Sequence, residues 1–202
     1  MKVEIHDKPW KHAIIDDLLP QNIFDKLLNF ALEYNKSPQV ANGAIRFSSH
    51  YQACYWGDDI GKLYNELVKS IDYIWDNYYK VLNFTDRDET ELLSERSVEI
   101  LYTQPQSNKE KLHGSVHTDT KIKLLSTCLY LFPEKGQGTI LHNQDKTVSH
   151  MVEWKQNRAL SFVRNGAKEM EENSYKKTFH SYINTNEVPR ISVNLFWMKD
   201  KK

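Results

Sequence analysis

Two stretches in the first 80 residues carry apolar side chains at helical spacing. In residues 21–35, apolar residues recur every third or fourth position, directly after Pro20. Residues 59–80 have a wider apolar face, which runs from Ile60 to Tyr78, and Asp58 or Asp59 can cap this segment at its start. The pattern therefore predicts two helices, over 21–35 and 59–80, that each pack one face against a sheet.

From residue 97 onward the pattern changes to short runs that are typical of β-strands, separated by turns rich in Gly, Pro and Asn. Strands are predicted over 97–104, 123–132, 139–142, 159–163 and 190–198. Residues 3–19 predict one or two further short strands, and residues 44–57 fit a strand with a flanking loop. We therefore expect a mainly β fold, a double-stranded β-helix (jelly roll) braced by two or more N-terminal helices.

The length fits one domain over residues 1–202, with a helical support region over 1–94 and a jelly-roll catalytic core over 95–200. Acidic and basic residues number 27 each, so no nucleic-acid partner is predicted. No apolar stretch approaches the roughly 20 residues of a membrane span, and the first residues lack an apolar signal core. Cys54 and Cys128 do not resemble a disulfide framework. We expect a soluble cytoplasmic protein without a membrane partner.

The candidate chemistry centres on His117-Thr118-Asp119. A His and an Asp two residues apart on an extended segment point to the same side, because side chains alternate along a strand. Both can therefore reach one ion, and a remote His180 would add a second imidazole. Two imidazoles and one carboxylate form the facial ligand set of non-haem Fe(II) oxygenases, which leaves coordination positions open for substrates.

The order His117-x-Asp119, His180 and Arg190-x-Ser192 resembles that of the 2-oxoglutarate- and Fe(II)-dependent dioxygenases, and within them the prolyl-4-hydroxylase-like group. The resemblance covers roughly residues 95–198. It implies that His117, Asp119 and His180 are the metal ligands. It also implies that Arg190 and Ser192 bind the distal carboxylate of 2-oxoglutarate, because a planar guanidinium can grip a carboxylate with two parallel hydrogen bonds.

Three further cofactor-binding residues are predicted with less support from the motif. Tyr102, on the strand before the ligand segment, resembles a tyrosine that hydrogen-bonds the cosubstrate in relatives. Thr127, Leu129 and Leu131 share one face of their strand, so we expect them to line the same pocket.

The resemblance implies hydroxylation of an aliphatic C–H bond with O2 and 2-oxoglutarate, and with release of succinate and CO2. Fe(II) would be the metal, and ascorbate is an additional candidate cofactor. Halogenating relatives replace the carboxylate ligand with a small residue, whereas this chain has Asp119, so hydroxylation is favoured. A prolyl residue in a peptide, or an amino acid, is the first candidate substrate. The oligomeric state is not predicted.

Two other readings of the motif are open. Two His and one carboxylate can also hold catalytic Zn2+, but a zinc hydrolase would not need Arg190 and Ser192 at this spacing. A cupin-like module that holds a metal without turnover would not need this anion clamp either. His113, His142 and His150 compete for the ligand role, but neither His142 nor His150 has a carboxylate two residues away, and His113 precedes a glycine in a loop.

Overall fold

The computed structural model describes residues 1–35, 44–48, 57–78, 81–82, 93–103, 105, 116–119, 123–163 and 177–199. Helix α1 (Gln21–Asn35) covers the residues predicted for the first helix. Helix α3 (Gly57–Tyr78) begins and ends two residues earlier than predicted. Neither helix combines the length and the apolar character that a membrane-spanning helix needs.

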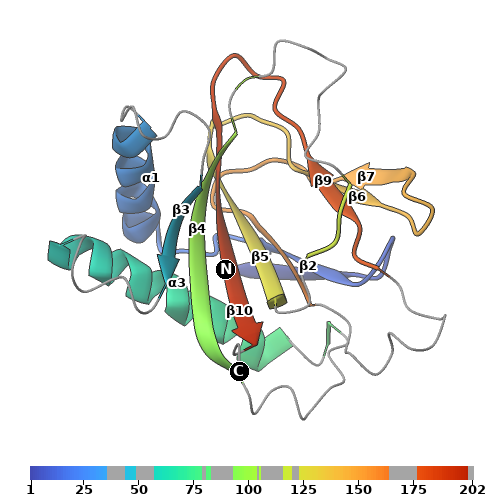
Figure 1. Ribbon diagram of the computed structural model, residues 1–202, viewed down its shortest axis with the longest axis horizontal. Coiled ribbons are helices and arrows are strands. Elements are labelled where there is room, and N and C mark those ends of the chain that lie inside the picture. The colour runs from blue at the N-terminus through green and yellow to red at the C-terminus, as the bar shows by residue number, and fades with distance from the viewer. Residues whose placement is uncertain are drawn as a thin grey trace.

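The strands form two antiparallel sheets (Figure 1). The seven-stranded sheet has the order β1-β2-β8-β5-β10-β4-β3, and the three-stranded sheet has the order β7-β6-β9. The strands of the larger sheet are β1 (Lys2–His6), β2 (His12–Asp16), β3 (Ala44–Ser48), β4 (Leu93–Thr103), β5 (Lys123–Phe132), β8 (Ala159–Val163) and β10 (Arg190–Lys199). The smaller sheet contains β6 (Thr139–His142), β7 (Val148–Met151) and β9 (His180–Tyr182).

Strand β7 is absent from the strands predicted from the sequence. All four of its residues are exposed, so the segment has no buried face that would give an alternating apolar pattern. The N-terminal region also contributes more than helices, because β1, β2 and β3 are part of the larger sheet. Residue 94 therefore does not separate a helical part from a sheet part.

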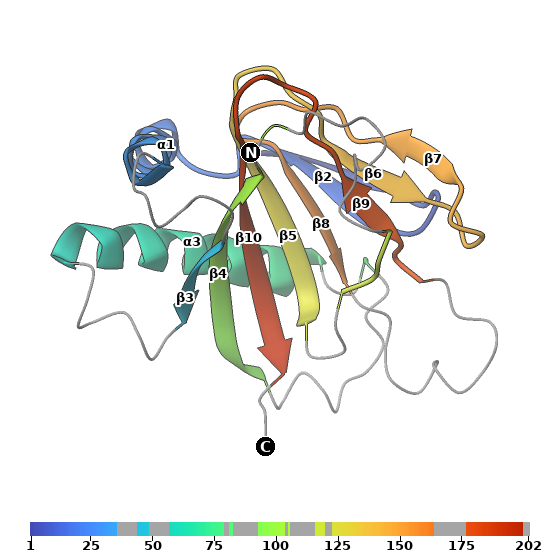
Figure 2. The ribbon, with the colours of Figure 1, turned by 45° about the horizontal axis from the view of Figure 1, so that its top comes forward.

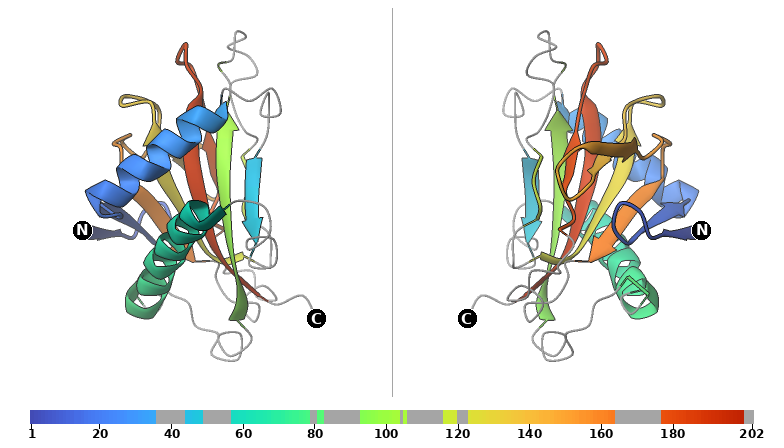
Figure 3. Two further views of the ribbon diagram at one scale, coloured as in Figure 1. Left: turned by 90° about the vertical axis from the view of Figure 1, so that its left-hand side faces the viewer. Right: turned by 90° about the vertical axis from the view of Figure 1, so that its right-hand side faces the viewer.

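The two helices cover one face of the larger sheet, and the smaller sheet lies over its other face (Figures 2 and 3). The main apolar core lies under the helices and includes Leu27 of α1, Ile71 of α3 and Val193 of β10, each at most 2% exposed. A second cluster lies between the sheets and includes Trp10, Tyr130 and Trp154. The part of the chain that the structure describes is thus mainly antiparallel β-sheet with two helices on one side.

Strand β10 shows how the two faces of the larger sheet differ. Ile191, Val193 and Leu195 belong to the core under the helices. The alternate residues, beginning with Arg190 and Ser192, line a cavity on the other face. The strand pairs with β4 and β5 along most of its length, so this face is held in a fixed register.

An ion pair joins the end of β2 to the start of β8. Arg158 donates from Nε to Oδ1 of Asp16 at 2.6 Å and from Nη2 to Oδ2 at 3.1 Å. Lys155 Nζ lies 3.2 Å from the same carboxylate. The hydrogen bonds from Arg158 and Lys155 outweigh the effect of burial and lower the pKa of Asp16 to about 2.

Asp16→Asn should lower the free energy of unfolding at pH 7 by about 1–3 kcal/mol, because it removes a charged hydrogen-bond acceptor. The Asp16 carboxylate is ionised above its unfolded pKa near 4, and its contribution is lost as the pH falls toward 2. The difference in free energy of unfolding between wild type and Asp16→Asn, measured by urea unfolding, should therefore shrink as the pH falls from about 4 toward 2. The neighbouring exposed Asp17→Asn is the matched control and should show little change. A difference for Asp16→Asn that is equal at pH 7 and pH 2 would contradict this account.

Candidate metal centre

Two histidines that are 63 positions apart in the chain face each other across a backbone bridge. The amide of His117 donates to the carbonyl of His180 at 3.0 Å, and the amide of His180 donates to the carbonyl of His117 at 2.9 Å. This is the closely bonded pair of an antiparallel ladder, in which both side chains leave the same side of the sheet. The two imidazole centres lie 4.5 Å apart. The fold therefore brings together the two histidines predicted from the motif.

Asp119 completes the group. One ligand atom from each of His117, Asp119 and His180 can be chosen so that all three lie within 4.8 Å of one another. Two imidazoles in adjacent positions of an octahedral ion, with bonds near 2.1 Å, have ring centres roughly 4.5 Å apart. The observed separation of 4.5 Å agrees with that arrangement.

The hydrogen bond made by His180 Nδ1 leaves the other ring nitrogen, Nε2, available to bind an ion. Its Nδ1 lies 2.9 Å from the carbonyl oxygen of Thr178, so Nδ1 carries the proton and Nε2 keeps its lone pair. Burial lowers the pKa of His180, despite the opposing effects of Asp119 and the Thr178 carbonyl, so the ring is neutral at pH 7. A neutral imidazole is the form that binds a metal.

Asp119 is held by two residues at the start of β5. Ser126 Oγ donates to Oδ2 at 2.5 Å, and Lys123 Nζ lies 3.3 Å from Oδ1. Burial would raise the pKa of Asp119, but His180, Lys123 and the Ser126 hydroxyl outweigh it, so the pKa lies below its ordinary value. The carboxylate is therefore ionised near neutral pH. Two neutral imidazoles and one oriented carboxylate form a donor set that fits Fe(II).

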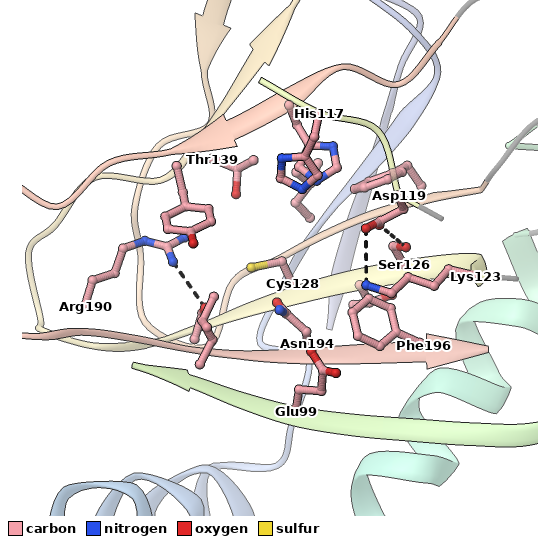
Figure 4. Close-up of a pocket in the computed structure, with 17 residues that line it drawn as sticks. Glu99, His117, Asp119, Lys123, Ser126, Cys128, Thr139, Arg190, Asn194 and Phe196 are labelled. Atoms are coloured by element: carbon pink, nitrogen blue, oxygen red, sulfur yellow. Dashed lines mark hydrogen bonds and ion pairs between the residues drawn. The ribbon is translucent and has the colours of Figure 1, made fainter. Parts of the chain in front are cut away.

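A cavity of about 260 Å³ extends from these residues between the two sheets (Figure 4). In this view Arg190 lies at the left, His117 at the upper centre and Asp119 to the right of His117. Asn194 and Glu99 lie on the opposite wall from His117, on strands β10 and β4. The cavity therefore has a metal-binding group and a guanidinium at separate positions.

Arg190 is 1% exposed, although it carries a permanent charge. Its Nη1 donates to Ser192 Oγ at 3.2 Å and its Nε donates to the carbonyl of Gln137 at 3.2 Å. The rings of Trp154 and Tyr182 lie 5.2 and 5.3 Å from the guanidinium carbon. Among the residues that the structure describes, no carboxylate pairs with Arg190. A buried guanidinium with only neutral protein partners is well suited to bind an anion.

The turn before β6 supplies the carbonyl group that Arg190 contacts. A Cβ at Gly138 would lie 1.8 Å from the carbonyl oxygen of Val152, so only glycine permits this close approach. The turn is thereby held against the segment that follows β7, with the Gln137 carbonyl facing Arg190. Sequence reasoning did not identify this contact.

The structure corrects the prediction for Tyr102. This side chain points to the helix face of β4, where its hydroxyl donates to the carbonyl of Ala31 at 3.0 Å. It is 3% exposed and belongs to the core under the helices. Burial raises its pKa well above the ordinary value. Tyr102 therefore does not contact a cosubstrate in the cavity; Glu99 and Leu101 of the same strand line it instead.

Of the three β5 residues predicted to line the pocket, Thr127 lines it, whereas the prediction is wrong for Leu129 and Leu131. Leu129 and Leu131 pack in the core under the helices and are fully buried. Thr127 reaches the cavity wall, but its hydroxyl is engaged with Ser161 Oγ at 2.8 Å. Ser126 and Cys128 of β5 also line the cavity. The run is buried on both sides, so its composition does not distinguish one face from the other.

The competing histidines lie elsewhere. His142 is 4% exposed, and its two ring nitrogens contact the carbonyl of Lys146 at 3.1 Å and Ser181 Oγ at 2.8 Å. His150 is exposed on β7 and is not among the residues that line the cavity. His113 lies outside the described residues.

The sequence matches no family model, and no curated protein sequence matches it at a significant level. The fold is similar to several solved structures. A Pseudomonas putida prolyl-4-hydroxylase has a TM-score of 0.60 and 13% identity, over 94% of this chain and 92% of that chain. A viral collagen prolyl hydroxylase from Paramecium Bursaria Chlorella virus-1, in complex with 2-oxoglutarate, has a TM-score of 0.56 and 15% identity, over 94% and 96%.

A third similar structure is the dioxygenase for auxin oxidation from Arabidopsis thaliana in complex with 2-oxoglutarate. It has a TM-score of 0.65 and 10% identity, over 93% of this chain and 82% of that chain. The chain therefore has the fold that these three structures share, two of which are prolyl hydroxylases and one a dioxygenase. The resemblance drawn from the motif is confirmed at the level of the fold, which by itself does not fix a reaction.

Asp119→Asn should weaken Fe(II) binding at least about tenfold under anaerobic conditions, because a neutral amide replaces the one anionic ligand. Equilibrium dialysis with Fe(II) measures the effect directly. Glu134→Gln, which removes an exposed carboxylate from the β5–β6 turn, is the matched control and should bind Fe(II) like wild type. Equal Fe(II) affinity for Asp119→Asn and Glu134→Gln would exclude Asp119 as a ligand.

Proposed function

We propose that this protein is an Fe(II)- and 2-oxoglutarate-dependent dioxygenase that hydroxylates an aliphatic carbon. In this reaction the substrate C–H bond, O2 and 2-oxoglutarate give the alcohol, succinate and CO2. One observation carries the proposal: the cavity has a His-Asp-His group at one place and, at another, a buried arginine with no carboxylate partner among the described residues. A dicarboxylic cosubstrate with a metal-chelating end and a free carboxylate end matches both features.

In this proposal His117, Asp119 and His180 would hold Fe(II), which would supply O2 activation. Three protein ligands would leave the remaining coordination positions for the keto acid end of 2-oxoglutarate and for O2. His180 Nδ1 keeps its proton and donates it in a hydrogen bond to the Thr178 carbonyl, which fixes the orientation of the ring. Ser126 and Lys123 orient the Asp119 carboxylate and keep it ionised.

Arg190 and Ser192 would bind the distal carboxylate of 2-oxoglutarate. Both line the cavity and are already joined by a hydrogen bond of 3.2 Å, so little reorganisation is needed on binding. The aromatic rings of Trp154 and Tyr182 exclude water around the guanidinium, which strengthens its attraction for an anion. Neither part of this clamp is required by a zinc hydrolase or by a cupin-like binding module without turnover.

The fold neighbours include prolyl hydroxylases, and this supports a prolyl or other peptidyl substrate, or an amino acid, as the first class to test. We also propose that the two facing sheets form a double-stranded β-helix and that residues 1–202 act as one catalytic domain. The comparisons give no support for ascorbate as a further cofactor. Succinate release, screened against peptides and amino acids, would identify the substrate.

Replacing Arg190 should raise the concentration of 2-oxoglutarate that half-saturates succinate release. Arg190→Lys keeps the charge but loses the planar fork, so an increase of at least about tenfold is expected. Loss of one partner from a buried charge pair commonly costs about 2–5 kcal/mol, so Arg190→Ala should cause at least about a thirtyfold increase. Ser192→Ala should have the smallest effect of the three.

Arg96→Gln provides an arginine control on the other face of the same sheet, where the guanidinium stacks on Trp197 at 4.1 Å. Its 2-oxoglutarate requirement should equal that of wild type. An unchanged requirement in Arg190→Lys and Arg190→Ala, with folded protein by circular dichroism, would remove Arg190 from the cosubstrate site.

A further inference from the structure

Three histidines from three strands gather on the molecule away from the cavity. His6 of β1 and His12 of β2 are direct partners in the antiparallel register, with ring centres 5.1 Å apart. His150 of β7 lies against His12, with ring centres 5.9 Å apart. We propose that His6, His12 and His150 form a second metal site, for Zn2+ or a similar divalent transition ion, that is separate from the candidate iron centre.

His12 carries the strongest part of the argument. It is fully buried, and its Nδ1 lies 2.9 Å from the carbonyl oxygen of Trp10. Its Nε2 is also buried and has no hydrogen-bond partner. Buried polar atoms are almost always hydrogen-bonded, so an unpartnered nitrogen needs an explanation. With the proton on Nδ1, Nε2 offers a lone pair of the kind that binds a metal.

His12 is oriented in the same way as a candidate iron ligand. His180 donates from Nδ1 to the carbonyl of the residue two positions earlier, Thr178, and His12 makes the same contact with Trp10. Burial lowers the pKa of His12 to about 4, so the ring is neutral at pH 7. Both histidines are thus fixed as neutral rings with Nε2 available, which is the state a metal requires.

Two of the ring separations are close to those of a tetrahedral site, although the nitrogen atoms of the three histidines do not all lie within 4.8 Å of one another in the present side-chain positions. Two imidazoles bound to one tetrahedral Zn2+ through bonds of about 2.0–2.1 Å have ring centres about 5 Å apart. The observed separations are 5.1 and 5.9 Å. The rings of His6 and His12 are nearly parallel, at 12°, so His6 must turn for both lone pairs to face one point. The side chain of His6 is 41% exposed, which leaves room for this rotation.

A carboxylate is available as a fourth ligand. Glu4 lies on the same face of β1 as His6, and its Oε2 is 3.8 Å from His6 Nε2. Its present partner is Lys2, at 2.7 Å, in an ion pair between two exposed side chains. Exposed ion pairs contribute little to stability, so a metal can displace Lys2 at small cost.

The histidine cluster is distinct from the candidate iron centre. Contacts between rings lead from His12 to Trp10, from Trp10 to Phe162 and from Phe162 to His180, at 5.3, 5.0 and 5.0 Å. Two aromatic side chains therefore connect the two groups. None of His6, His12 and His150 lines the cavity, so the second site does not depend on the proposed enzymatic function.

The test uses the full chain with His117→Ala and Asp119→Ala, which leaves one of the three candidate iron ligands. Calorimetric titration of this background with Zn2+ should give one ion per chain. Adding His6→Ala and His150→Ala should weaken that binding at least tenfold. Both positions are at least partly exposed, so the fold should persist, as checked by circular dichroism. Adding Val148→Ala instead, an exposed change on the same strand as His150, should leave Zn2+ binding unchanged.

Co2+ provides a second readout on the same variants. The background should bind Co2+ with the visible absorption of a tetrahedral complex, and the variant without His6 and His150 should lose it. Absence of Zn2+ binding in the background would overturn the proposal. Unchanged Zn2+ affinity after loss of His6 and His150 would also overturn it, because the ion would then be held by other residues.

Discussion

The alternation of side chains along the central strands decides where polar chemistry can occur in this molecule. On β10, Ile191, Val193 and Leu195 complete the core under the helices, and the intervening residues face the space between the sheets. The core side fixes the register, because a shift by one residue would bury polar groups and expose apolar ones. Arg190 is consequently held in a buried position that its charge would not otherwise favour.

The second constraint is the backbone bridge between His117 and His180. It joins a short segment to the edge strand β9 through two hydrogen bonds, and it sets the two rings side by side. The bridge places these ligands opposite the polar face of β10, so the metal group and the guanidinium share one cavity. Packing of the apolar core and pairing of a few backbone groups thus place the residues of the site.

The sequence predicted much of this arrangement because some patterns have one physical solution. The apolar residues in 21–35 recur at helical spacing, and a helix forms there. His117 and Asp119 have the two-residue spacing that puts side chains on the same side of an extended segment. Together with His180 and Arg190 they line one cavity. The faces of β4 and β5 were not predictable in the same way. β5 is buried on both sides, so Leu129 and Cys128 are equivalent in an apolar pattern. Tyr102 was misplaced because a tyrosine can serve equally in a cavity or, as here, in a hydrogen bond to a helix carbonyl.

The central claim is that His117, Asp119 and His180 hold Fe(II) with one side open to 2-oxoglutarate. Visible spectroscopy of the protein with Fe(II) and 2-oxoglutarate, without oxygen, tests it most directly. Chelation of Fe(II) by the keto acid within this ligand set predicts a weak charge-transfer band that needs all three components and is lost in His180→Ala. A sample that stays colourless, or a band of equal strength in His180→Ala, would contradict the account.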